Sequence, residues 1–146
     1  MGLFSKAKKE TDSFQSMGKT MGNELIGLYS KEINLSFDKT TELERQILAV
    51  YFFGMSNGLM QNLKLKNSPM EIAEMIKNNL VDVFHYSNEQ AGQFLDSMIS
   101  DLQSKDPRNT QYVIIHRGLE GYFAWEEGQK GNVIKDVCQI INTLKG

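Results

Sequence analysis

Four helix-start signals divide the chain and restrict what it can fold into. Ser68-Pro69-Met70-Glu71 places a serine N-cap before a proline at the first helical position and a glutamate at the third. Ser87-Asn88-Glu89-Gln90 follows the same capping-box logic, and Asp106-Pro107 offers an aspartate cap followed by proline. Thr41-Glu42-Leu43-Glu44 gives a further start, with Asp38 and Thr40 nearby as alternative caps. These signals predict separate helices that are joined by short connections.

Apolar residues with helical spacing fill the intervals between the start signals. They recur every three or four positions through the ranges 14–28, 43–59, 70–84, 91–102, 112–123 and 133–144. The second range is apolar on nearly every side at Val50–Phe53, which is typical of a central helix. Alternation of period two is confined to Ile33–Phe37, where we expect an extended loop because no second strand is available. The sequence therefore predicts an all-α fold, a compact single-domain bundle of about six helices with short loops.

The length of 146 residues suits a single domain over residues 1–146. A lysine-rich start predicts a flexible basic tail over residues 1–11. No run of about 18 apolar residues occurs, so we expect no transmembrane segment. Cys138 is the only cysteine, which excludes an internal disulfide and fits a reducing compartment, the cytoplasm.

Negative charge gathers in the middle of the chain. The formal net charge is −2, yet the only lysine or arginine in residues 68–104 is Lys77. An acidic surface repels phosphate, which argues against DNA or RNA as a ligand, and it attracts a basic protein. A solvated face of two amphipathic helices is the alternative interpretation. The acids that we name as candidate partner contacts are Glu71, Glu74, Asp82, Glu89 and Asp96.

The run Val113–Trp125 is the most apolar and most aromatic stretch, yet it contains His116, Arg117 and Glu120. Because an unpaired buried charge is costly, we expect Arg117 to pair with Glu120 or with a carboxylate of the acidic middle helices. His116 would bridge helices within the same buried polar cluster. Direct contact with a partner is the alternative.

Glycines interrupt two of the predicted helices. Gly118 and Gly121 lie in the run Val113–Trp125, and Gly54 and Gly58 lie in the predicted central helix. A glycine inside a helix costs about 1 kcal/mol relative to alanine, so each one needs a structural reason. We expect close packing or a backbone break at the first pair, and the close approach of another helix at the second.

Aromatic residues end the same run beside carboxylates. Tyr122 and Trp125 are followed directly by Glu126 and Glu127. This combination is typical of a binding hot spot for a basic partner. The end of a core helix that reaches the surface would give the same pattern, so both interpretations stay open.

Residues that could carry out a reaction are sparse. Walker, dinucleotide-binding and nucleophile-elbow motifs do not occur. His116 and Glu120 lie four positions apart on one helix face, and His85 and Asp82 lie three apart on another. Convergence of these residues would support a metal-dependent or acid–base enzyme that uses His116, Glu120 and His85, although neither pair matches a recognised metal motif. We keep this enzyme as an alternative and assign no catalytic residue, metal ligand or cofactor.

Three segments resemble one bacterial family. They are Phe53-Gly54-Met55-x-Asn57-Gly58, Tyr86-Ser87-x-Glu89-Gln90-Ala91, and Ile114-Ile115-His116-Arg117-Gly118-x-x-Gly121-Tyr122. Over about residues 45–125 the chain resembles an all-α family of predicted immunity proteins from polymorphic toxin systems. The resemblance implies a small cytoplasmic protein that binds and blocks a cognate toxin made by the same cell. Together with the missing catalytic motifs and the acidic middle of the chain, it predicts a binding protein without chemistry of its own.

The acidic side chains would then cover a basic active site on the toxin. A structural helical adapter or a homodimer is a further alternative, and the sequence does not define the oligomeric state.

Overall fold

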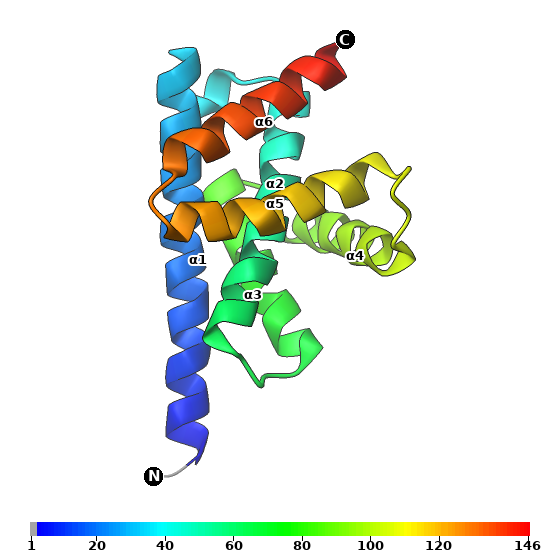
Figure 1. Cartoon of the computed structure of the whole chain (residues 1–146). Coiled ribbons are helices and arrows are strands. Elements are labelled where there is room, and N and C mark those ends of the chain that lie inside the picture. Colours follow the sequence, from blue (N-terminus) through cyan, green and yellow to red (C-terminus); the bar gives the residue numbers. More distant parts are fainter. Residues whose placement is uncertain (1–2) are drawn as a thin grey trace.

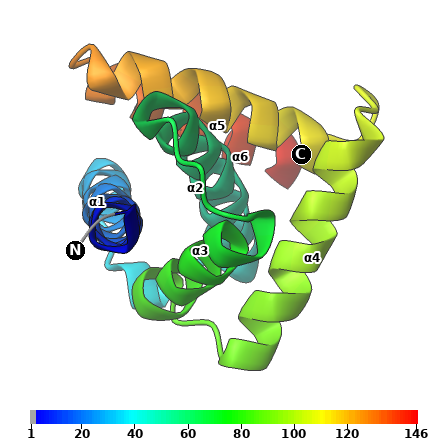
Figure 2. The ribbon, with the colours of Figure 1, turned by 90° about the horizontal axis from the view of Figure 1, so that it is seen from below.

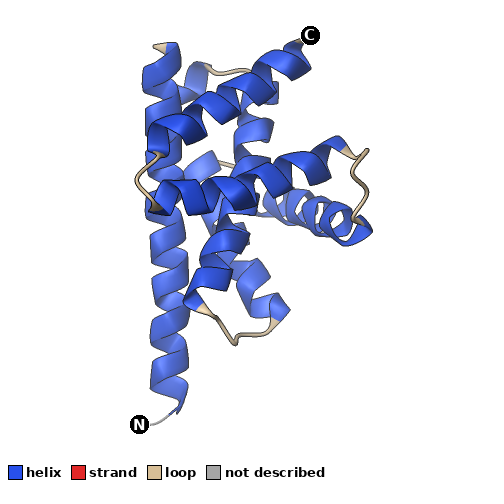
Figure 3. Cartoon of the chain, viewed as in Figure 1, coloured by secondary structure: helices blue, strands red, loops and turns tan. Residues whose placement is uncertain are grey.

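The chain folds into helices joined by short loops (Figures 1 and 3). The computed structural model describes residues 3–146, and the side chains from Ser13 onward. A 3₁₀ turn, η1 (Phe37–Lys39), follows the first helix. No strand occurs in this part of the chain, so the predicted all-α bundle of six helices is confirmed. The helices are α1 (Leu3–Ile33), α2 (Glu42–Leu63), α3 (Pro69–Phe84), α4 (Asn88–Ser104), α5 (Thr110–Glu126) and α6 (Lys130–Lys145).

The predicted basic tail coincides with the beginning of α1. Met1 and Gly2 lie outside the described residues, and residues 3–11 belong to the helix. The flexibility of this segment stays a prediction. Within the described range, no helix is both long and apolar enough to cross a bilayer.

Three of the predicted helix starts are confirmed as complete capping boxes. The side chains of Thr41, Ser68 and Ser87 each accept a hydrogen bond from the backbone N–H three residues later. In return, the side chain at that third position accepts from the backbone N–H of the cap. Each box satisfies two amide groups that a helix start would otherwise leave without a partner.

The fourth predicted start is wrong by a few residues. Asp106 Oδ1 accepts from the backbone N–H of Arg108 at 2.9 Å and closes a turn ahead of the helix. Asn109 is the actual N-cap, and its side chain accepts from the backbone N–H of Tyr112 at 2.9 Å. An aspartate before proline can begin a turn as readily as a helix, and here the turn forms.

Helix α2 lies in the middle of the bundle. Figure 2 shows α1 to one side of it, α4 to the opposite side, and α5 passing across it with α6 behind. The buried core includes Leu48, Tyr51, Phe52 and Met55, which are fully enclosed on successive sides of α2. A helix surrounded in this way must be apolar nearly all round, as the segment Val50–Phe53 predicts.

The closest helix contact is the crossing of α2 and α5 at paired glycines. A Cβ added to Gly54 would overlap the carbonyl oxygen of Ile115 and lie 2.9 Å from the Cα of Gly118. One added to Gly118 would overlap the carbonyl oxygen of Tyr51. At Gly121 the same addition would overlap the hydroxyl of Tyr51. Close packing, and not a backbone break, therefore accounts for the glycines of both helices.

The connection between α1 and α2 is a loop, as the sequence predicts, but it is not extended throughout. Ile33 is the last residue of α1, and Asn34 takes a left-handed conformation with φ 54°. The 3₁₀ turn η1 then brings the ring of Phe37 against that of Phe84, with 6.1 Å between centroids. The apolar side chains therefore anchor the loop through a turn of helix instead of a strand-like segment.

Candidate functional site

A polar cluster joins the three helices that meet near Arg117. The Arg117 guanidinium donates to Asp136 Oδ1 on α6, and the Tyr51 hydroxyl donates to Asp136 Oδ2 at 3.1 Å. The two charged side chains keep only 35% and 29% of their surface exposed. Burial and the charge of Asp136 raise the pKa of Tyr51, so the phenol stays protonated and donates.

This arrangement corrects the predicted partner of Arg117. The carboxylate comes from Asp136 on the last helix, and not from Glu120 or the acidic middle of the chain. The cluster links α2, α5 and α6 through charge-assisted hydrogen bonds. Its geometry is that of a structural tie between helices.

His116 and Glu120 lie outside that cluster, on the surface of α5. Their side chains are 53% and 73% exposed, and 3.5 Å separates His116 Nδ1 from Glu120 Oε1. Tyr112 lies beside the imidazole, at 6.0 Å between ring centroids. The prediction that His116 is a buried helix bridge is therefore wrong, because its side chain is exposed and contacts Tyr112 and Glu120 of its own helix. An exposed pair of this kind contributes roughly 0–1 kcal/mol.

The four residues of the alternative metal site do not converge. His85 ends α3 and lies 6.3 Å from the ring of Phe37. Asp82 faces Lys19, with 3.8 Å between carboxylate oxygen and Nζ. Among the described residues, no three histidine, cysteine or carboxylate side chains are grouped so that they could hold a metal ion. These four residues therefore do not form the metal or acid–base site that the alternative enzyme would need.

The five candidate acids of the middle helices all lie exposed on α3 and α4. Glu71 is engaged in the α3 capping box, where hydrogen bonds from the Ser68 backbone and hydroxyl lower its pKa. Asp82 pairs with Lys19. The other three acids have no hydrogen bond or ion pair to any side chain in the described part of the chain, and they are Glu74, Glu89 and Asp96.

The two aromatic candidates at the end of α5 belong to the core. Tyr122 is 1% exposed, and its hydroxyl accepts from Asn62 Nδ2 at 2.9 Å. Trp125 is 6% exposed and lies under the ammonium of Lys130, 5.1 Å from the ring centroid. Both rings are therefore buried, as the core-helix interpretation predicts, and their contact with a partner stays a prediction. Glu126, which follows Trp125, is exposed.

Several grooves cut into the surface of the bundle, and two of them differ in their lining. One, of about 370 Å³, lies between α2, α4, α5 and α6, and no charged side chain lines it. The other, of about 230 Å³, lies between α1 and the C-terminal end of α5, and we call it the α1/α5 groove. Its walls bring Met17 and Glu24 opposite Trp125 and Glu126, a juxtaposition that helical spacing alone could not reveal.

The sequence analysis did not identify Glu44 as a buried carboxylate. Glu44 is 5% exposed, and it accepts hydrogen bonds from the Tyr29 hydroxyl and the backbone N–H of Thr41. Burial acts to raise its pKa, but these bonds and the nearby Lys145 ammonium outweigh burial and lower it. Its role as the third residue of a capping box was visible in the sequence, whereas its contact with α1 was not.

The chain matches a known protein family. A family model described as immunity protein 48 matches residues 22–145. No curated protein and no solved structure matches the chain. The matched range takes in the last part of α1 and all of α2 to α6.

Proposed function

The chain belongs to the immunity protein 48 family, and on that basis we propose that it binds a cognate protein toxin and neutralises it without catalysing a reaction. The family match is the observation that carries this proposal. The proposed compartment is the cytoplasm of the cell that makes the toxin, as the family resemblance implies. Electrostatic and shape complementarity, not chemistry, would supply the protection.

The acidic face of α3 and α4 supports a basic partner. We define this face by three carboxylates, Glu74, Glu89 and Asp96, all of which are exposed and form no ion pair with a side chain that the structure describes. Unpaired surface carboxylates accelerate encounter with a positively charged protein and hold it in a preferred orientation. A toxin that acts on an anionic substrate has a basic active site, which this face would cover.

Co-expression tests the proposal directly. The wild-type chain is produced together with the product of the neighbouring reading frame, and survival and co-purification are scored. We expect growth to be restored and the two proteins to purify together. A neighbouring product that is harmless on its own, or that fails to co-purify, would refute the proposed function.

Charge reversal then tests the contact face. Glu74→Lys is compared with Glu32→Lys, because both glutamates are exposed on helices and both changes alter net charge equally. We expect Glu74→Lys to slow association about threefold to tenfold at low salt, and Glu32→Lys to have little effect. Raising the salt concentration should shrink the difference. Equal association rates for the two variants would remove the acidic face from the interface.

A further inference from the structure

We propose that the α1/α5 groove receives a lysine or arginine side chain of the toxin, an inference that rests on the proposed function and adds a second contact surface to it. The groove brings apolar side chains, an aromatic ring and carboxylates together in about 230 Å³. These are the groups that bind the aliphatic stem and the cationic head of a basic side chain.

A cation of this chain already contacts two of the side chains that line the groove, one from each wall. Lys130 Nζ lies 2.5 Å from Glu24 Oε1 and 5.1 Å from the centroid of the Trp125 ring. An ammonium is thus bound by a carboxylate and an aromatic face together, both of which line the groove. This internal contact shows which chemistry the surface accommodates.

The α5 wall also carries a second carboxylate, Glu126, next to Trp125. Glu126 lines the groove, and no lysine or arginine side chain in the described part of the chain pairs with it. Burial raises the pKa of Tyr122, a hydrogen bond from Asn62 opposes this effect, and the negative charge of Glu126 adds to it. An uncharged occupant would bury the Glu126 charge unpaired, which is costly, whereas a basic side chain would compensate it.

Methionines supply the apolar part of the groove. Met17 is 42% exposed at its edge, and Met21 is nearly buried below it. Flexible thioether side chains adapt to the stem of an incoming lysine or arginine. The groove of about 370 Å³ between α2, α4, α5 and α6 has no charged lining, so it offers no comparable reason to select a basic residue.

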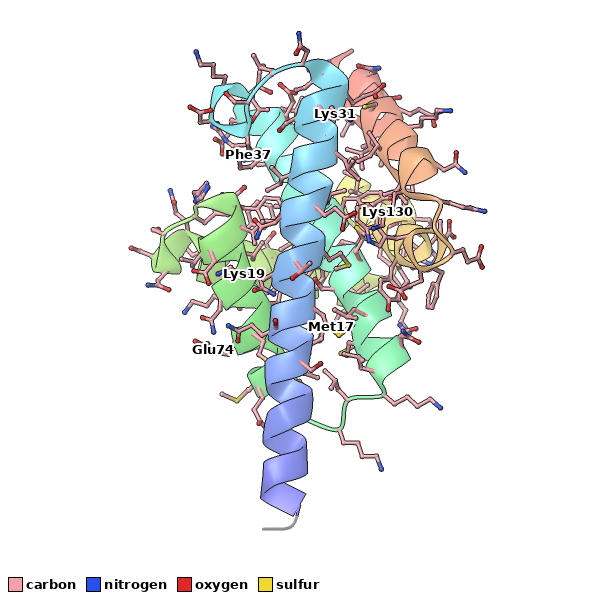
Figure 4. All side chains as sticks on the ribbon, turned by 90° about the vertical axis from the view of Figure 1, so that its left-hand side faces the viewer. Met17, Lys19, Lys31, Phe37, Glu74 and Lys130 are labelled. Atoms are coloured by element: carbon pink, nitrogen blue, oxygen red, sulfur yellow. The ribbon has the colours of Figure 1, made fainter. Side chains whose placement is uncertain are left out.

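The position of the groove fits a partner that also contacts the acidic face. In Figure 4, Met17 and Lys130 lie on one side of α1, and Glu74 lies on the other. A basic protein seated across α1 would therefore meet Glu126 on one side and Glu74 on the other. The two surfaces attract the same charge, so they reinforce one another.

The only tryptophan of the chain lines the groove and reports its occupancy. The protein is labelled with 5-fluorotryptophan, so that Trp125 gives a single fluorine resonance, and is titrated with the unlabelled product of the neighbouring reading frame. Two variants are compared with wild type, Glu126→Gln and Met17→Lys. The second places a cation of this chain at the mouth of the groove. Glu32→Gln, an exposed glutamate outside the groove, is the matched control.

We expect the toxin to shift the Trp125 resonance and both groove variants to bind about tenfold more weakly. Glu32→Gln should bind like wild type, and all variants should melt like wild type because the altered side chains are exposed. If the toxin binds tightly without shifting the Trp125 resonance, and Glu126→Gln binds it as well as wild type, the groove is not a contact surface. That result would leave the proposed function intact. If the Trp125 resonance shifts but Glu126→Gln binds the toxin as tightly as wild type, the occupant of the groove is uncharged. That result would refute the proposal that a lysine or arginine side chain enters the groove. Failure of wild type to bind would refute both proposals together.

Discussion

Replacing Gly118 with alanine tests the crossing on which the fold depends. A Cβ at this position would overlap the carbonyl oxygen of Tyr51 and lie 3.1 Å from the Cα of Gly54. Both neighbours are backbone atoms of α2, so no side-chain rotation can relieve the contact. The two helices would have to separate, and the packing around α2 would loosen with them.

The magnitude follows from two opposing effects. Alanine favours a helix over glycine by about 1 kcal/mol, while overpacking a well-packed contact costs about 1–3 kcal/mol. Because the contact here is between backbones, we expect the upper part of that range and a net loss of about 2 kcal/mol. For a chain of this length the loss corresponds to a fall in melting temperature of about 4–8 °C.

The chain provides a matched control in Gly27, a helical glycine of α1 that has nothing within 4 Å of an added Cβ. Gly27→Ala should raise the free energy of unfolding by about 0.5–1 kcal/mol, so the two substitutions should differ in sign. Thermal and urea unfolding measure both. Gly54→Ala combined with Gly118→Ala should cost less than the sum, because one separation of the helices accommodates both methyl groups. A Gly118→Ala protein that melts at or above wild type would refute the reasoning.

Two further predictions concern the polar contacts. Arg117→Ala should lower the free energy of unfolding by about 1–2 kcal/mol, and a double-mutant cycle with Asp136→Ala should reveal coupling. An unchanged melting temperature with loss of toxin binding would instead make Arg117 an interface residue. The pKa of Glu44 lies below its ordinary 4.5 in the folded chain, so its contribution to stability is present above about pH 4.5 and is lost as pH falls through the folded pKa. Tyr29→Phe removes a donor to this carboxylate, so urea unfolding at about pH 6 and about pH 3 should show a smaller acid-induced loss than in wild type; an equal loss would contradict this assignment.

The sequence predicts those features that depend on neighbours in the chain. Capping boxes at Thr41, Ser68 and Ser87 need only residues three positions apart, and all three form. The glycines also carry a readable signal, because a residue that weakens a helix needs a compensating contact. The failure at Asp106 shows the limit of local reasoning, since a turn and a helix start share the same residue preferences.

Contacts between helices that lie far apart along the chain could not be predicted from the sequence. Arg117 had several candidate carboxylates, and only the packing of α6 against α5 selects Asp136. Tyr122 and Trp125 follow a pattern that suits either a surface or a core. The placement of α1 beside the end of α5 encloses them, and no periodicity within α5 encodes that placement.

The same crossing of α2 and α5 connects stability with the proposed contact surface. Gly118 lies about two helical turns before Glu126, so a shift of α5 at the glycines would displace the wall of the α1/α5 groove from α1. Loss of binding in Gly118→Ala would therefore be inseparable from loss of packing. Glu126 is exposed and forms no part of the core. A substitution there can weaken binding while the melting temperature stays constant, and for that reason Glu126 distinguishes a binding surface from a packing contact.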